Sequence, residues 1–132
     1  MFKSISLAEM MNAIMANVET NTGIQCYNAI PAAPQEPYYY LEIIEKTPLY
    51  SKTIRRDSFV VRFHAMPINN QSMAPTYDML HRLEEALGQE IELPEGFDLF
   101  LQQSNGIQKL EIEEFKETRT VAIYNFVVCC TN

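Results

Sequence analysis

The chain has 132 residues, of which 47% are hydrophobic and only four are glycine, a composition typical of a single packed domain over residues 1–132. Its formal net charge is -7, and the excess lies in the second half: residues 1–66 hold six basic and six acidic side chains, whereas residues 67–132 hold four and eleven. Proteins that bind duplex DNA concentrate Lys and Arg, so this charge balance argues against direct DNA binding. The acidic residues of the second half form either a solvated surface or a surface that complements a basic partner or lines a passage.

A first helix is predicted to begin near Leu7. Ser6 and Glu9 form the S-x-x-E pattern of a capping box, in which each side chain accepts a hydrogen bond from the backbone N–H of the other residue. Apolar residues then recur at helical spacing and share one face: Leu7, Met10, Met11, Ile14, Met15 and Val18. We expect this helix to end before Asn21 and to pack that face against a sheet.

Two or three strands are predicted next. Residues 24–29 form a short candidate strand, and a proline-rich run leads into a strand over residues 38–46. Alternation places Tyr39 on the core side of this strand and Tyr38 and Tyr40 on the other side. These two tyrosines are either covered by another element or available as a subunit interface, because Tyr contributes apolar area while its hydroxyl tolerates water.

A long flexible loop is predicted over residues 46–57, before the next strand at residues 58–65. Hairpins usually close with two to five residues, so this longer polar stretch suggests a role beyond chain reversal. It carries the local excess of positive charge, and its candidate contact residues are Lys52, Arg55, Arg56 and Asp57. Either the loop is simply solvated, or its arginines pair with phosphates or with carboxylates of a neighbouring copy, for which residues 111–117 are available.

A second helix is predicted to follow Pro75, which suits a first helical turn, and to stop at Gly88. Its buried stripe is expected to contain Tyr77, Leu80, Leu83 and Leu87.

Three strands are predicted to complete the chain. Residues 97–102 alternate in polarity, and Asn105-Gly106 is the dipeptide typical of a tight hairpin turn. Residues 109–113 then form a strand with an acidic outer face, and residues 120–130 form a long strand that is apolar on both faces, which indicates a central position or an interface. The whole order predicts an α+β fold in which two helices pack on a mostly antiparallel sheet of about five to six strands.

No set of residues in the sequence spells out a catalytic centre. His64 and His81 lie on different predicted elements, and Cys129 and Cys130 point to opposite faces of one strand, so neither pair is arranged to hold a metal ion. The chain has neither a nucleophile elbow nor a phosphate-binding glycine loop. We therefore predict no enzyme activity, no metal and no cofactor. The three cysteines favour a reducing compartment, and no stretch approaches the roughly 18 apolar residues of a membrane span.

The order of elements and three segments have a parallel in a known family. The segments are Pro34-Gln35-Glu36-Pro37-Tyr38-Tyr39, Phe59-Val60-Val61-Arg62-Phe63 and the helix from Leu80 to Leu87. Together they resemble the tail-completion or tail-terminator proteins of long-tailed bacteriophages over nearly the whole chain. The resemblance implies a structural protein that forms a ring, commonly a hexamer, at the end of the tail tube, stops tube growth and joins the tail to the head. It implies no catalytic residues.

Two hypotheses on function follow. The first is a virion assembly protein of the head-tail junction, assembled in the host cytoplasm. Its partners would be further copies of itself in a hexameric ring, the tail tube protein, a head-completion or connector protein, and DNA that passes through the lumen without sequence-specific binding. No membrane is involved, the basic loop would contact a neighbour or face the lumen, and the tyrosine face would be a subunit interface. The alternative is a small cytoplasmic α+β module that binds a peptide or ligand through that tyrosine-bearing face.

Overall fold

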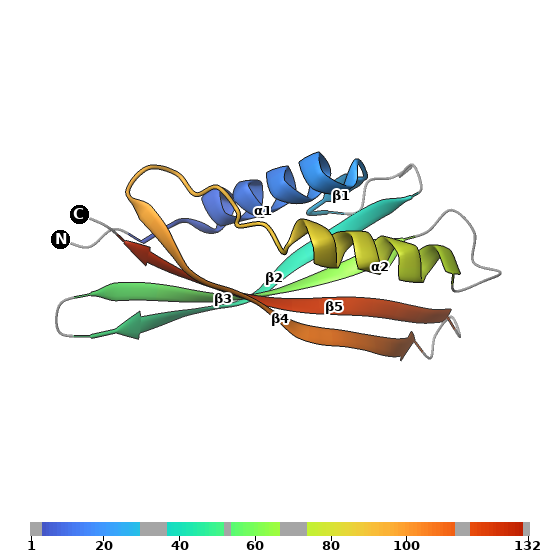
Figure 1. The fold of residues 1–132 in the computed structure, drawn as a ribbon. Helices are drawn as coiled ribbons and strands as arrows, with labels where there is room; N and C mark the ends of the chain where they lie inside the picture. The colour runs from blue at the N-terminus through green and yellow to red at the C-terminus, as the bar shows by residue number, and fades with distance from the viewer. Residues whose placement is uncertain (1–3, 30–36, 52–53, 67–73, 113–116, 131–132) are drawn as a thin grey trace.

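Two helices pack on one face of a five-stranded sheet in the computed structural model of the chain (Figure 1). The structure describes residues 4–29, 37–51, 54–66, 74–112 and 117–130, including all of their side chains except those of residues 109–112, 117–119 and 130. The elements are α1 (Leu7–Thr22), β1 (Gln25–Tyr27), β2 (Tyr38–Tyr50), β3 (Arg55–Met66), α2 (Ala74–Ala86), β4 (Phe97–Ile112) and β5 (Glu117–Cys130). The sheet order is β1-β2-β3-β5-β4, parallel between β1 and β2 and antiparallel elsewhere, which confirms the predicted α+β fold.

The first helix has the predicted start and a glycine end. The Ser6 hydroxyl accepts a hydrogen bond from the Glu9 N–H at 3.1 Å, and the Glu9 carboxylate accepts one from the Ser6 N–H at the same distance. At the other end Gly23 adopts φ 72° and donates its N–H to the Glu19 carbonyl, so α1 runs two residues further than expected. Glycine suits this left-handed position because it has no Cβ to clash.

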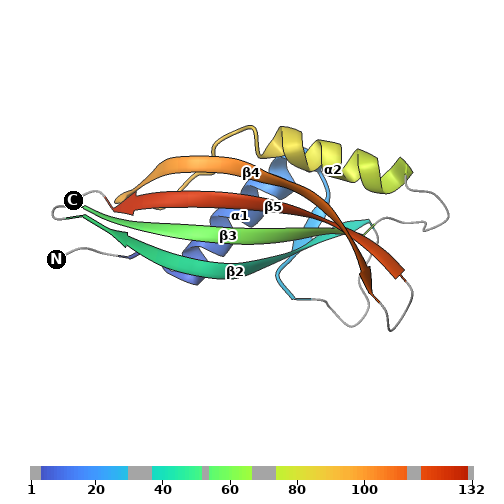
Figure 2. The same ribbon diagram turned by 90° about the horizontal axis from the view of Figure 1, so that it is seen from below.

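The core lies between the helices and one face of the sheet. Its largest fully buried side chains include Tyr39, Phe59, Phe63, Phe126, Met10 and Ile14. The Tyr39 hydroxyl donates a hydrogen bond to the Met79 carbonyl and so joins β2 to α2. The opposite face of the sheet has no helix over it, as the view from below shows (Figure 2). We call it the helix-free face.

The loop expected over residues 46–57 is wrong in extent, because most of it is strand. β2 continues to Tyr50 and β3 begins at Arg55, and the two pair without a gap from Lys46–Phe59 to Tyr50–Arg55. Pro48 has no backbone N–H to donate to a neighbouring strand. It is tolerated because β1 pairs with β2 only at residues 38–40, so in the described chain no strand lies beside the outer edge of β2 at Pro48. The connection is therefore a short one at the tip of a long hairpin.

The hairpin predicted at Asn105-Gly106 is also wrong. β4 passes straight through this dipeptide and stays paired with β5 on both sides, so two strands follow α2 instead of three. Ser104 pairs with Tyr124 and Ile107 with Ala122, which leaves two residues of β4 opposite one of β5. The dipeptide is thus a β-bulge, and Gly106 supplies its positive φ of 103°.

The second helix buries most of the predicted stripe. Leu80, Leu83 and Leu87 are buried as expected, together with Met79, but Tyr77 is 58% exposed. The buried side of the helix includes Thr76 and Met79, each one residue before a member of the expected stripe. Neither helix of the described chain is long and apolar enough to cross a membrane.

Candidate interaction surfaces

The two arginines of the predicted basic loop lie on opposite faces of the sheet. Both are in β3, where successive side chains alternate, so Arg55 lies on the helix side and Arg56 on the helix-free face. Asp57 follows Arg55 on the helix side and is buried. Lys52, the fourth candidate, lies outside the described residues. The structure therefore separates a group of residues that the sequence placed in one mobile segment.

Arg55 and Asp57 hold the N-terminal segment against the hairpin. The Arg55 guanidinium contacts the Asp57 carboxylate at 3.4 Å, and the Ser4 hydroxyl donates to the same carboxylate at 3.1 Å. Lys46 of β2 donates to the Ser4 hydroxyl at 2.9 Å and to the Ile5 carbonyl at 2.7 Å. These contacts satisfy the buried Asp57 carboxylate and the Lys46 ammonium group within one copy, which indicates a structural role for this cluster.

Arg56 instead forms an exposed patch with an aromatic ring. Its guanidinium carbon lies 4.0 Å from the centroid of the Phe100 ring, a cation–π geometry, and its Nε is buried with no hydrogen-bond partner among the described residues. Phe100 is 60% exposed, and Leu49, which pairs with Arg56 across the hairpin, is 44% exposed. We call these three residues the Arg56–Phe100 patch.

A bulge in β4 creates this patch. Leu99 pairs with Val128 and Leu101 pairs with the adjacent Val127, so Phe100 is an extra residue with no position opposite it. A bulge re-aims a side chain and bends its strand. Because of this bulge, Leu101 and not Phe100 takes the ladder position opposite Val127.

The tyrosines predicted as a subunit interface differ in accessibility. Tyr38 is only 4% exposed, and its ring meets that of Tyr27 of β1 edge-on at 5.5 Å. Tyr40 is half-buried on the helix-free face, where its ring lies 5.4 Å from that of His64. His64 in turn contacts the Glu42 carboxylate at 2.8 Å. Tyr40 thus remains a candidate for contact with another chain, whereas Tyr38 is covered within its own copy.

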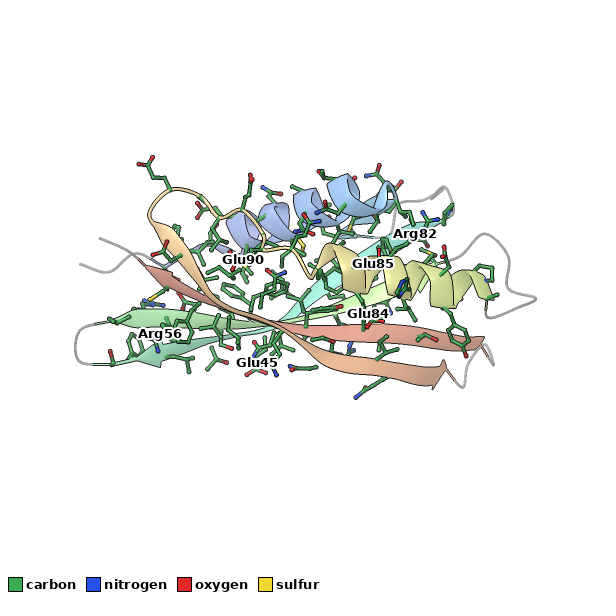
Figure 3. The ribbon with its side chains drawn as sticks, in the orientation of Figure 1. Glu45, Arg56, Arg82, Glu84, Glu85 and Glu90 are labelled. Carbon is green, nitrogen blue, oxygen red and sulfur yellow. The ribbon has the colours of Figure 1, made fainter. Side chains whose placement is uncertain are left out.

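Among the described residues, a group of acidic side chains lies on the helix side of the molecule. Arg82 is the one Lys or Arg residue in α2 and in the connector after it (residues 87–96). The same two segments carry six exposed carboxylates: Asp78, Glu84, Glu85, Glu90, Glu92 and Glu95. Figure 3 shows Glu84, Glu85 and Arg82 along α2 and Glu90 on the connector, while Arg56 lies near the tip of the β2–β3 hairpin. The two Glu residues of the predicted acidic strand face that lie in β4 and β5, Glu111 and Glu117, belong to the residues whose side chains are not described.

A groove opens between α1 and this connector. Its volume is about 630 Å³, within the range of natural binding pockets. Three of its lining side chains are carboxylates, Glu9, Glu90 and Glu92, and its apolar wall is formed by Ala13, Ala16, Leu93 and Pro94. The side-chain oxygen of Asn17, which also lines it, is buried and has no hydrogen-bond partner in the described chain. We call this the acidic groove.

The connector that lines the groove is fixed by one glutamine of β4. The Gln102 amide donates to the Leu87 carbonyl at 2.7 Å and to the Gln89 carbonyl at 2.8 Å, and it accepts from the Ile91 N–H at 3.1 Å. The Asn17 amide adds a bond from α1 to the Gln89 carbonyl at 3.1 Å. An irregular segment needs such partners, because its backbone groups have no ladder or helix to satisfy them.

Burial raises the pKa values of one cysteine and two tyrosines of the core. Burial, with a smaller contribution from the Glu19 charge, raises the pKa of the Cys26 thiol to about 12. Burial likewise raises the pKa of Tyr39 and of Tyr124. A thiol that stays protonated at neutral pH is a poor nucleophile. Among the described residues no three His, Cys, Asp or Glu side chains are grouped so as to hold a metal ion.

Sequence reasoning missed both the Arg56–Phe100 patch and the acidic groove. The patch depends on a bulge, and the groove depends on α1 meeting a segment more than seventy residues away, as the Asn17–Gln89 hydrogen bond shows. The available signal for the groove was the run of carboxylates between Asp78 and Glu95 with a single arginine among them. The available signal for the patch was Arg56 itself.

Comparison with known proteins points to one family. Residues 1–131 match the model of the phage tail terminator family described as "Putative tail termination protein". No curated protein sequence matches the chain. Among solved structures 22 chains match its fold. One of them, from the structure titled "Virion of native gene transfer agent (GTA) particle", has a TM-score of 0.70 and 18% sequence identity, with 96% of this chain and 99% of that chain covered. At this identity the structural match speaks to the fold.

Proposed function

The chain belongs to the phage tail terminator family, and on that basis we propose that it forms a ring at the head-proximal end of the tail, stops growth of the tail tube and joins the tail to the head. Membership of the family gives it a structural role in tail assembly and a place in the virion tail. The family match over residues 1–131 is the observation that carries the proposal.

The ring, its six copies and its partners are parts of this proposal. The tail tube protein would lie on one side of the ring, and a head-completion or connector protein on the other. DNA would pass through the lumen without being gripped, which is consistent with a net charge of -7 and a strongly acidic helix side.

The distribution of surface groups supports self-association. The helix-free face carries the exposed Phe100 and Leu49, and the helix side carries the carboxylates, so one copy offers different surfaces to two neighbours. Such head-to-tail contacts use two distinct patches and close into a ring when the rotation between copies allows it.

Two measurements test the proposal. The mass of the purified protein is measured from low to high micromolar concentration, and electron microscopy follows tail tubes grown with and without the protein. We expect a ring-sized species and tubes of limited length whose ends carry extra density. A protein that stays monomeric at every concentration and leaves tube length and tube ends unchanged would contradict the proposal.

A further inference from the structure

We propose that the Arg56–Phe100 patch of one copy docks in the acidic groove of the next copy. The inference rests on the proposed ring, and it names the two surfaces that would join its subunits. It differs from the counterpart expected from sequence: the basic side is Arg56 without Arg55, and the acidic side is the groove beside α1 instead of the strand over residues 111–117.

The patch has the chemistry of an unfilled contact. Phe100 lies at a bulge in β4 and is 60% exposed, and Leu49, which pairs with Arg56, is 44% exposed. The guanidinium carbon of Arg56 lies 4.0 Å from the centroid of the ring, and the guanidinium has no carboxylate partner among the described residues. Exposed aromatic and arginine side chains held in this way are the residue types enriched at the centres of protein interfaces.

The groove has the complementary chemistry. The carboxylates of Glu90 and Glu92 are exposed at its edge, and the fork of an arginine matches a carboxylate in two parallel hydrogen bonds. The Asn17 side-chain oxygen is a buried acceptor without a donor among the described residues, and an incoming N–H group would satisfy it. The apolar wall of Leu93 and Pro94 offers a surface for an aromatic ring.

A second copy fits the groove better than nucleic acid does. A groove lined by three carboxylates repels phosphate, which excludes DNA as its occupant. Arg56 lies on the helix-free face and α1 lies on the helix side, so each copy carries one donor and one acceptor surface. The two surfaces approach each other at the β4 edge, where Phe100 and Glu90 both line a smaller pocket of about 220 Å³. This arrangement produces the head-to-tail contact that a ring requires.

The test uses two variants that each damage one surface. Arg56→Glu reverses the charge of the patch, and the double variant Glu90→Lys with Glu92→Lys reverses the charge of the groove. The matched control is Glu84→Lys with Glu85→Lys, which makes the same change of charge on exposed carboxylates of α2 outside the groove lining. Phe100→Ser is a second patch variant, because an exposed ring is removed with little effect on folding.

Self-association is measured by analytical ultracentrifugation, and folding by circular dichroism. We expect both patch variants and the groove variant to dimerise or assemble at least about tenfold more weakly than wild type, while the Glu84/Glu85 control assembles like wild type. Mixing the Arg56→Glu protein with the groove variant should restore association, because each mixed pair contains one intact patch facing one intact groove.

Three outcomes overturn the inference: folded patch variants that assemble like wild type, a control that is as defective as the groove variant, or a mixture that stays dissociated. Each of these outcomes can be observed only if the wild-type protein self-associates. In that case the ring proposal is kept, and its interface lies elsewhere. A wild-type protein that never self-associates removes the ring and this interface together, and the measurement of mass under the proposed function identifies that case separately.

Discussion

Replacement of Gln102 by Met should destabilise the protein by about 2–3 kcal/mol. The side chain is close in size, so packing is retained, while three hydrogen bonds to Leu87, Gln89 and Ile91 are lost. Each hydrogen bond contributes about 0.5–1.5 kcal/mol net, and water partly replaces those at the exposed Gln89 carbonyl. A domain with about 5–15 kcal/mol of total stability should show this loss clearly as a lower urea midpoint.

The matched control is Gln103→Met, which makes the same chemical change one residue later. Gln103 is exposed, so its replacement should change the free energy of unfolding by less than about 0.5 kcal/mol. Equal effects of the two variants would refute the reasoning, because they would mean that water serves the connector as well as the Gln102 amide does.

Gln102→Glu separates donors from acceptors in the same network. An ionised Glu still accepts from the Ile91 N–H, but it faces the Leu87 and Gln89 carbonyls with no proton to donate. Its folded pKa should therefore lie above the ordinary value of about 4.3. A raised folded pKa means that the deficit relative to wild type is largest at neutral pH and shrinks as the pH falls through that pKa. A deficit that grows on acidification would contradict this assignment.

Two further predictions concern Arg55 and the buried thiol. Arg55→Ser should lower stability by about 1 kcal/mol in urea denaturation and leave self-association unchanged, because Arg55 contacts Asp57 within its own copy; weakened association would contradict the separation of Arg55 from Arg56. Burial raises the pKa of Cys26 from 9.0 to about 12, so the free energy of unfolding should fall as the pH rises above about 9, by up to about 1.4 kcal/mol per pH unit. The fall should be less steep in Cys26→Ala, and identical slopes in the two proteins would contradict the prediction.

Local signals predicted the helices well. The capping box at Ser6 and Glu9 involves contacts within one turn, so it forms wherever the sequence is helical, and the structure shows both of its hydrogen bonds. The stripe of α2 was nearly right, but Tyr77 is exposed because tertiary packing selected Thr76 and Met79 for burial. Periodicity identifies a helix more reliably than it identifies which edge of the stripe is buried.

The strands failed where turn signals compete with pairing. Asn105-Gly106 favours a turn through its own backbone preferences, but β5 offers a partner on both sides of the dipeptide, and a bulge accommodates it at a smaller cost than a broken ladder. The polar residues over 46–57 similarly suggested a loop, but β2 and β3 pair with each other there. Polar side chains do not prevent strand pairing near the edge of a sheet, because every second side chain can face solvent. Neither outcome is readable from a window of the sequence, since the partner strand is distant.

The last strand limits what kind of interface the helix-free face can form. Its apolar pattern on both faces predicted a central position or an interface, and β5 is central, between β3 and β4. Val121 and Val127 are nevertheless already buried on the helix-free side within one copy. Val121 and Val127 therefore offer little apolar area to a neighbour, and the exposed apolar side chains described on this face include Phe100 and Leu49.

A contact that combines a small apolar patch with charge pairs should be weak for one pair of copies and sensitive to salt. In a closed ring every copy engages two neighbours, so releasing a copy requires breaking two contacts, and the second contact of a copy forms at a high effective concentration. The proposed interface would thus give subunits that separate readily as pairs but persist once the proposed ring has closed. This is the behaviour expected of a part that must assemble onto the end of a tube without first forming open chains.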